Sequence, residues 1–85
     1  MRNILVVTGG AGFIGSNLIS ELFKFKKFNI LSIDNYSSGL SKNHIKNKRV
    51  KYLKGSTKNI AILLKSYIGK IHSIFHLSLK ILFFY

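Results

Sequence analysis

Three glycines spaced three residues apart, Gly9, Gly12 and Gly15, have the type and spacing for a defined chemistry. Glycine at the first position can adopt the backbone angles of a tight turn. Glycine at the second lets an anionic group approach the backbone, and glycine at the third lets a helix pack closely on a strand. The amides near Phe13 and Ile14 would then face the anion at the start of that helix. The pattern predicts a pyrophosphate-binding turn.

This interpretation requires a strand before the turn and a helix after it. Residues 3–7 are a short apolar run rich in β-branched side chains, which is typical of a buried strand. Residues 13–25 carry apolar side chains at helical spacing. The other common phosphate loop needs Lys and then Ser or Thr after its last glycine, and Ser16 and Asn17 exclude it. A glycine-rich turn without a ligand remains the alternative.

Asp34 is one of only two acidic residues, and it follows a second apolar run at residues 28–33. It lies 34 − 15 = 19 positions after Gly15, close to the spacing of about 20 in a dinucleotide-binding fingerprint. A carboxylate at this point can accept hydrogen bonds from ribose hydroxyls and would repel a 2′-phosphate. The spacing therefore favours NAD over NADP, with a simple turn or cap role for Asp34 as the alternative.

The remaining sequence continues the alternation of strands and helices. Residues 49–54 alternate polar and apolar, as in a half-exposed strand. Residues 59–68 predict a second helix that stops at Gly69, and residues 71–77 predict a fourth strand. We expect an α/β fold, a partial Rossmann (doubly wound) parallel sheet with strand order 3-2-1-4. The outer edge of the fourth strand is expected to be unpaired and open to association.

The composition limits the class of protein. A chain of 85 residues is one small domain or part of a larger one. It contains no Cys, which rules out disulfides and thiolate metal sites and fits a cytoplasmic location. The apolar runs are too short for a secretory signal or a membrane-spanning helix. We therefore expect a cytoplasmic protein.

The net charge of +12, from 14 Lys and Arg against 2 acidic residues, normally suggests an anionic partner. The lysines are spread along the chain and accompany heavy use of Ile, Asn and Phe, which indicates a biased composition. A small basic protein that binds nucleic acid or a membrane surface is therefore an alternative that the spread of charge disfavours.

The run Ile4–Ser16, followed by Ile33-Asp34-Asn35 and Ser38-Gly39, resembles the extended short-chain dehydrogenase/reductase family. The resemblance is greatest to its NAD-dependent nucleotide-sugar epimerases and dehydratases, of which UDP-glucose 4-epimerase is typical. It implies an enzyme family in which bound NAD takes a hydride from a sugar carbon and returns it. It also implies contacts to four parts of the cofactor. The pyrophosphate would be contacted by Gly9, Gly12, Phe13, Ile14 and Gly15, and the adenosine ribose by Asp34 and Asn35. The adenosine-phosphate side would be lined by Ser37, Ser38 and Gly39, and the adenine would lie near Ser56.

The sequence departs from the family at three points. Ser56 stands where the family usually has an Asp that accepts from the adenine amino group. Leu79 stands where a small residue usually lies beside the cofactor. We therefore assign residues 1–78 to the N-terminal part of an NAD-binding Rossmann domain and residues 79–85 to an apolar tail without a recognised family counterpart.

The third departure is catalytic: no tyrosine has a lysine four residues on, so the family's acid/base pair is absent.

From this we expect a truncated enzyme that is inactive alone, with no catalytic residue of its own. A nucleotide-sugar would be a substrate only in a full-length relative. His72 and His76 lack a third ligand, so no metal is expected and both are expected to be structural. The alternatives are a non-catalytic nucleotide-binding module, or one half of a split enzyme that docks through its open sheet edge.

Overall fold

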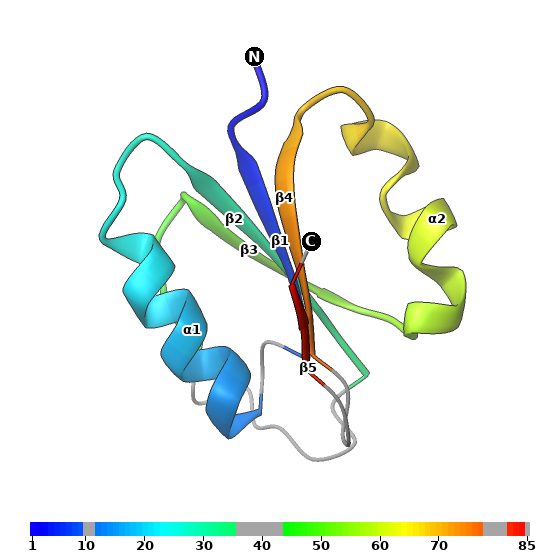
Figure 1. The fold of residues 1–85 in the computed structure, drawn as a ribbon, viewed down its shortest axis with the longest axis horizontal. Helices are drawn as coiled ribbons and strands as arrows, with labels where there is room; N and C mark the ends of the chain where they lie inside the picture. The colour runs from blue at the N-terminus through cyan, green and yellow to red at the C-terminus, as the bar shows by residue number, and fades with distance from the viewer. Residues whose placement is uncertain (10–11, 36–43, 78–81, 85) are drawn as a thin grey trace.

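One sheet forms the centre of the structure, and its strands are β1 (Ile4–Thr8), β2 (Asn29–Asp34), β3 (Val50–Lys54), β4 (Ile71–Leu77) and β5 (Leu82–Phe84). The computed structural model describes residues 1–9, 12–35, 44–77 and 82–84. The order of the strands across the sheet is β3-β2-β1-β4-β5, and β1 to β4 are parallel to one another (Figure 1). The predicted α/β class and the 3-2-1-4 order are confirmed.

Helical segments cover both faces of this sheet (Figure 1). One face carries α1 (Phe13–Phe23). The opposite face carries a segment made of η2 (Thr57–Asn59), α2 (Ile60–Leu63) and η3 (Lys65–Tyr67). Because strands covered on both faces bury every residue, β1 and β2 are near-continuous apolar runs.

The core consists of two layers, because successive strand residues point to opposite faces of the sheet. Val6 and Leu31 pack toward α2, whereas their neighbours Val7 and Ile30 pack toward α1. The buried hydrophobic residues of the α2 layer are Val6, Leu31, Ile33 and Leu64, and those of the α1 layer are Val7, Ile19, Ile30 and Val50.

The predicted end of the first helix at Phe25 is wrong by two residues, since α1 ends at Phe23. The amides of Lys24 and Phe25 donate to carbonyls three residues back, those of Glu21 and Leu22, at 3.2 and 3.0 Å. This tighter spacing closes the helix before its lysine-rich turn.

Arg49, just before β3, caps the carbonyls at this end of α1. Its guanidinium donates to the carbonyl oxygens of Phe23 at 2.9 Å and Phe28 at 3.1 Å. A third donation reaches the carbonyl of Phe25 at 3.5 Å, and the guanidinium lies 4.1 Å from the centre of the Phe23 ring. Arg49 thereby ties the end of α1 to the start of β3, a connection between residues more than twenty positions apart.

The predicted helix over residues 59–68 is wrong in its continuity. The amide of Leu64 donates to the carbonyl of Ile60, four residues back, but the amide of Tyr67 donates to Leu64, three residues back. The segment therefore changes between α and 3₁₀ geometry at Leu64. Both spacings keep apolar residues on one face over so short a segment, so the apolar pattern alone could not separate them.

The expectation of an unpaired outer edge on β4 is also wrong over part of its length. The strand β5 pairs with β4 in antiparallel register, and Leu82 lies opposite Leu77 while Phe84 lies opposite Phe75. Its three residues are apolar, and an apolar extended segment can pair with an open edge that lies next to it in sequence.

Candidate functional site

The carboxyl ends of β1, β2, β3 and β4 meet at one edge of the sheet, because these strands are parallel. The glycine turn follows β1, Asp34 ends β2 and Ser56 follows β3. The structure thus brings together, at one edge, the predicted site residues that it describes. Ser37, Ser38 and Gly39 lie outside the described residues, as do Gly10 and Ala11 of the turn.

Gly9 is required by the fold itself. Its φ is +76°, in the left-handed region that favours glycine. A Cβ placed there would lie 2.9 Å from the carbonyl oxygen of Leu77 and 3.3 Å from its Cβ. The Gly9 amide also donates to the carbonyl of Ile33 at 2.7 Å, so the start of the turn is held against both neighbouring strands.

Gly12 has no comparable structural constraint. Its φ of −77° and ψ of 175° are extended backbone that any residue can adopt. Of the described residues, a Cβ there would meet only the carbonyl oxygen of Gly9, at the ordinary contact distance of 3.6 Å. Among the described residues, nothing therefore opposes a side chain at this position or a ligand that approaches the backbone there.

The first amides of α1 follow directly after Gly12. The amide of Gly12 donates to the carbonyl of Gly9 at 3.2 Å, and the first helical acceptor, the Gly12 carbonyl, takes the amide of Ser16 at 2.8 Å. The amides of Phe13, Ile14 and Gly15 lie between these two donors. The helix has no carbonyl four residues before them that could accept their hydrogen bonds. No side chain among the described residues caps this helix end, and helix ends of this kind can bind anions.

The side chains of the same turn do not compete for that space. The Ser16 hydroxyl donates to the Gly12 carbonyl, and the Asn17 side-chain amide donates to the Phe13 carbonyl at 2.9 Å. Both polar groups turn back onto the helix. The Phe13 and Ile14 side chains are exposed, and Gly15 is buried within α1.

Asp34 is half-buried at the end of β2, opposite Lys54 of β3 in register. Its carbonyl accepts the amide of Gly55 at 2.9 Å, which extends the pairing of the two strands to the edge. Asn35 follows it and is exposed. The second acid, Glu21, is in an exposed ion pair with Lys24 on α1.

Ser56 lies at the same edge, where β3 passes into η2. Its hydroxyl accepts the amide of Lys58 at 3.2 Å, and its carbonyl accepts the amide of Asn59 at 3.0 Å. Ser56 therefore starts the 3₁₀ turn. A hydroxyl can both accept and donate, so this position can still offer a proton to a ligand.

Thr8 and His76 are the residues at this edge that the sequence interpretation did not assign to the site. The Thr8 hydroxyl lies 2.8 Å from Nδ1 of His76, across 68 positions of sequence. The signal in the sequence was a polar residue at the end of a buried apolar strand, directly before the first glycine of the turn. Which β4 residue it meets is fixed only by the register of the two strands.

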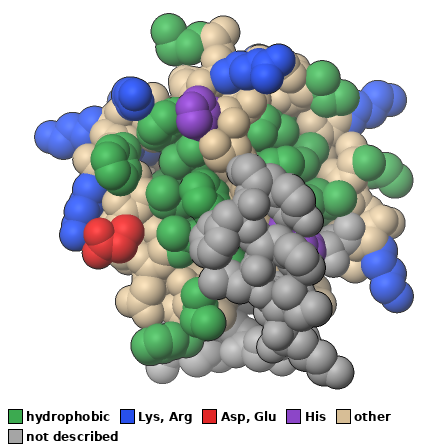
Figure 2. Space-filling view, in the orientation of Figure 1, with side chains coloured by type: hydrophobic (Ala, Val, Ile, Leu, Met, Phe, Trp, Pro, Cys, Tyr) green, Lys and Arg blue, Asp and Glu red, His purple; other side chains and the backbone are tan. Residues whose placement is uncertain are grey.

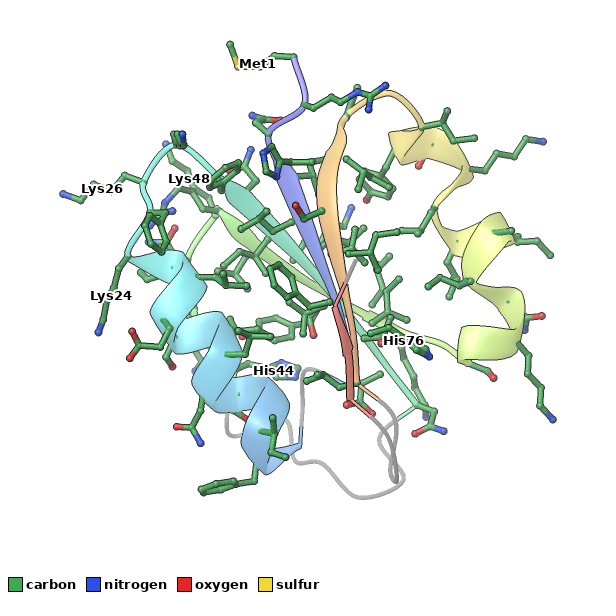
Figure 3. All side chains as sticks on the ribbon, in the orientation of Figure 1. Met1, Lys24, Lys26, His44, Lys48 and His76 are labelled. Carbon is green, nitrogen blue, oxygen red and sulfur yellow. The ribbon has the colours of Figure 1, made fainter. Side chains whose placement is uncertain are left out.

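Among the described residues, charge and metal chemistry indicate no second site. Lys and Arg side chains lie around the periphery of the molecule on both the α1 and the α2 side (Figure 2). Lys24, Lys26 and Lys48 extend at the end of the molecule opposite His76 (Figure 3). Over the ranges that the structure describes, no three His, Asp or Glu residues come together to hold a metal ion, and none of the helices there is long and apolar enough to span a membrane.

A strand, a glycine turn and a helix N-terminus, followed by an acid at the end of the next strand, define the Rossmann class of nucleotide-binding α/β proteins. Residues 6–82 match the 3-beta hydroxysteroid dehydrogenase/isomerase family, and the chain belongs to that family. The match confirms the resemblance to NAD-dependent epimerases and dehydratases that the sequence suggested.

Individual relatives point in the same direction. The chain is 38% identical over 84 residues to the uncharacterized UDP-glucose epimerase YtcB of Bacillus subtilis, covering 87% of this chain and 25% of that protein. The epimerase Mth375 of Methanothermobacter thermautotrophicus superposes with a TM-score of 0.76 at 32% identity, covering 89% of this chain and 22% of that one.

A dehydratase shows the same fold. The dTDP-glucose 4,6-dehydratase of Bacillus anthracis, solved in complex with NAD, has a TM-score of 0.78 at 27% identity over 89% of this chain and 26% of its own. The chain thus spans about a quarter of the length of these relatives.

Proposed function

We propose that this chain binds NAD at the carboxyl edge of its sheet, as the N-terminal part of an NAD-dependent nucleotide-sugar epimerase or dehydratase. The observation that carries the proposal is the fit at Gly12. Among the described residues, only the Gly9 carbonyl oxygen lies near a Cβ built on Gly12, and the amides of Phe13, Ile14 and Gly15 follow it at the start of α1. A pyrophosphate is the anionic group that fits a helix N-terminus behind such a turn.

Each remaining residue has a role in the proposed complex. The Asp34 carboxylate accepts hydrogen bonds from the hydroxyls of the adenosine ribose, and the Asn35 side chain forms hydrogen bonds with the same ribose. The Ser56 hydroxyl contacts the adenine. The loop residues Ser37, Ser38 and Gly39 line the adenosine-phosphate side. When bound, the nicotinamide supplies the hydride chemistry of the family, and the residues of this chain bind and orient the other half of the cofactor.

The two acids of the chain provide a matched test of this site. We expect Asp34→Asn to weaken NAD binding by roughly ten- to a hundredfold, the loss typical of a hydrogen bond to a charged group. The same substitution should also reduce the ratio of the affinity for NAD to the affinity for NADP. Glu21→Gln removes the same charge from the exposed side of α1 and should leave both affinities unchanged. Isothermal titration calorimetry measures the affinities of the wild type and of both variants for NAD and for NADP.

Equal losses in the two variants would show a non-specific effect of net charge. Saturable NAD binding that survives Asp34→Asn would remove the assigned role of this carboxylate. Steeply salt-dependent DNA binding that is unaffected by Asp34→Asn or Gly12→Val, with no binding of NAD, would favour the basic nucleic-acid-binding alternative.

The proposal also separates the two halves of the cofactor. The assigned residues all follow β1, β2 and β3, which hold the adenosine diphosphate half in a Rossmann fold. We therefore expect ADP-ribose to bind with an affinity similar to that of NAD, and nicotinamide mononucleotide to bind far more weakly. The chain contains no Tyr-x-x-x-Lys pair, so we propose that it does not turn over a sugar nucleotide by itself. Detectable epimerisation by the purified chain would contradict this.

A further inference from the structure

A buried hydroxyl joins the carboxyl ends of β1 and β4. Thr8 is completely buried, and its Oγ1 accepts the backbone amide of Leu77 at 3.0 Å. The same oxygen lies 2.8 Å from Nδ1 of His76. Both partners are on β4, so one side chain of β1 contacts two consecutive residues of the neighbouring strand.

The donor and acceptor capacities of these groups fix the state of the imidazole. A threonine hydroxyl has one proton and two lone pairs. One lone pair takes the Leu77 amide, and the structure gives this hydroxyl no other acceptor than His76 Nδ1 among the described residues. If Nδ1 carried a proton, the Thr8 proton would be left without an acceptor at a fully buried position, which is costly. The arrangement that satisfies the Thr8 hydroxyl has it donating to an unprotonated Nδ1, with the ring proton on Nε2.

The position of this contact gives it functional weight. In a sheet of order 3-2-1-4 the chain winds outward in both directions from the boundary between β1 and β4. Dinucleotides bind in the crevice outside the carboxyl ends of the strands at this switch point. Thr8 spans that boundary and immediately precedes Gly9, where an added Cβ would lie 2.9 Å from the carbonyl oxygen of Leu77. His76 lies on the same side of β4 as α2, near the lower end of the sheet as drawn (Figure 3).

We propose that His76 is a positioning residue for the dinucleotide site, an inference that rests on the proposed NAD function. With its proton on Nε2, the ring accepts a hydrogen bond from the Thr8 hydroxyl through Nδ1, and an oxygen lone pair of Thr8 stays directed at the Leu77 amide. This holds the ends of β1 and β4 at a fixed separation beneath the glycine turn. His76 acts through Thr8 and needs no contact with the cofactor.

The first test does not involve NAD. In a ¹⁵N-labelled sample at mildly alkaline pH, long-range ¹H–¹⁵N spectra should show His76 as the Nε2–H tautomer. Hydrogen exchange should find the Leu77 amide protected in the wild type and in His76→Asn, whose side-chain oxygen can replace Nδ1 as acceptor. The protection should fall in His76→Leu. A protonated Nδ1, or a Leu77 amide equally protected in all three proteins, would overturn the proposal.

The second test titrates NAD into the same proteins after circular dichroism has shown that they are folded. We expect His76→Leu and Thr8→Val each to weaken binding roughly fivefold, the effect of one hydrogen bond. The double variant should be no weaker than Thr8→Val, whereas Thr8→Ser and His76→Asn should bind nearly as the wild type does. His72→Leu, which removes the other histidine of β4, is the control and should not change the affinity.

The outcomes separate the two hypotheses. If the wild type binds no NAD, the proposed function fails, and the tautomer and the Leu77 exchange still decide the role of His76. If the wild type binds NAD and His76→Leu binds it equally well, the positioning role is refuted and the proposed function stands.

Discussion

Gly9 and Gly12 belong to one motif, but the structure gives them different reasons to be glycine, and a pair of alanine substitutions separates these reasons. Gly9→Ala should destabilise the fold. A left-handed φ costs a non-glycine residue roughly 1–2 kcal/mol. The new Cβ would also lie 2.9 Å from the carbonyl oxygen of Leu77, which is backbone of β4 and cannot rotate away. Overpacking of this kind adds about 1–3 kcal/mol, so we expect a total loss of about 2–5 kcal/mol.

Gly12→Ala should leave stability almost unchanged. Its backbone angles suit alanine, and reduced freedom of the unfolded chain contributes about 0.4–1 kcal/mol in favour of the variant. Gly12 is also the N-cap of α1, where alanine is less favourable than glycine by a similar amount. The two effects offset each other. The new methyl group occupies the space assigned to the pyrophosphate, so NAD affinity should fall at least about tenfold.

Thermal unfolding and NAD titration of the two variants give the result. For a domain of this size, the loss in Gly9→Ala corresponds to a fall in Tm on the order of 10 °C or more. Gly12→Ala should unfold within a few degrees of the wild type, and its weakened binding should therefore reflect the site alone. Two findings would refute the reasoning: a Gly12→Ala protein as unstable as Gly9→Ala, or one that binds NAD with unchanged affinity.

Three further substitutions test contacts that support the site from a distance. Arg49→Lys keeps the charge but loses the planar fork that reaches the carbonyls at the end of α1, and should cost about 1–2 kcal/mol in urea unfolding. Ser32→Ala removes a buried hydroxyl that has no hydrogen-bond partner among the described residues, so stability should stay within about 0.5 kcal/mol or rise; a clear loss would reveal a partner such as a bound water. Tyr52→Phe removes the acceptor of the Ile45 amide at 2.8 Å and should cost about 1 kcal/mol, measured in the same way.

The parallel strands could be predicted from the sequence because burial on both faces requires uninterrupted apolar runs. The runs at residues 3–7 and 28–33 give β1 and β2 to within one residue at each end. The same periodicity could not show that the segment around Leu64 changes from α to 3₁₀ geometry, because both forms bury the same side. The strand β5 was missed because its three residues gain their structure from pairing with β4, which no local pattern encodes.

The candidate site divides in a similar way. The glycine spacing and the distance from Gly15 to Asp34 are local signals, and the structure places these residues at one edge of the sheet. The contact between Thr8 and His76 joins residues 68 positions apart, and it depends on the register of β1 against β4. A contact that bridges two strands depends on their register, so no local spacing in the sequence predicts it.

Asp34 also bears on the kind of anion that this edge can bind. In a chain of net charge +12, general attraction of phosphates would be strongest with no acid near the helix terminus. Only two acids are present, and one of them lies at the end of β2, where it opposes that attraction. A carboxylate at this position is unfavourable for a bare phosphate, and it is favourable for a ligand that presents hydroxyl donors beside its phosphates. The ribose of an adenine dinucleotide is such a ligand, so the cost of Asp34 to general anion binding is an argument for a nucleotide site at this edge.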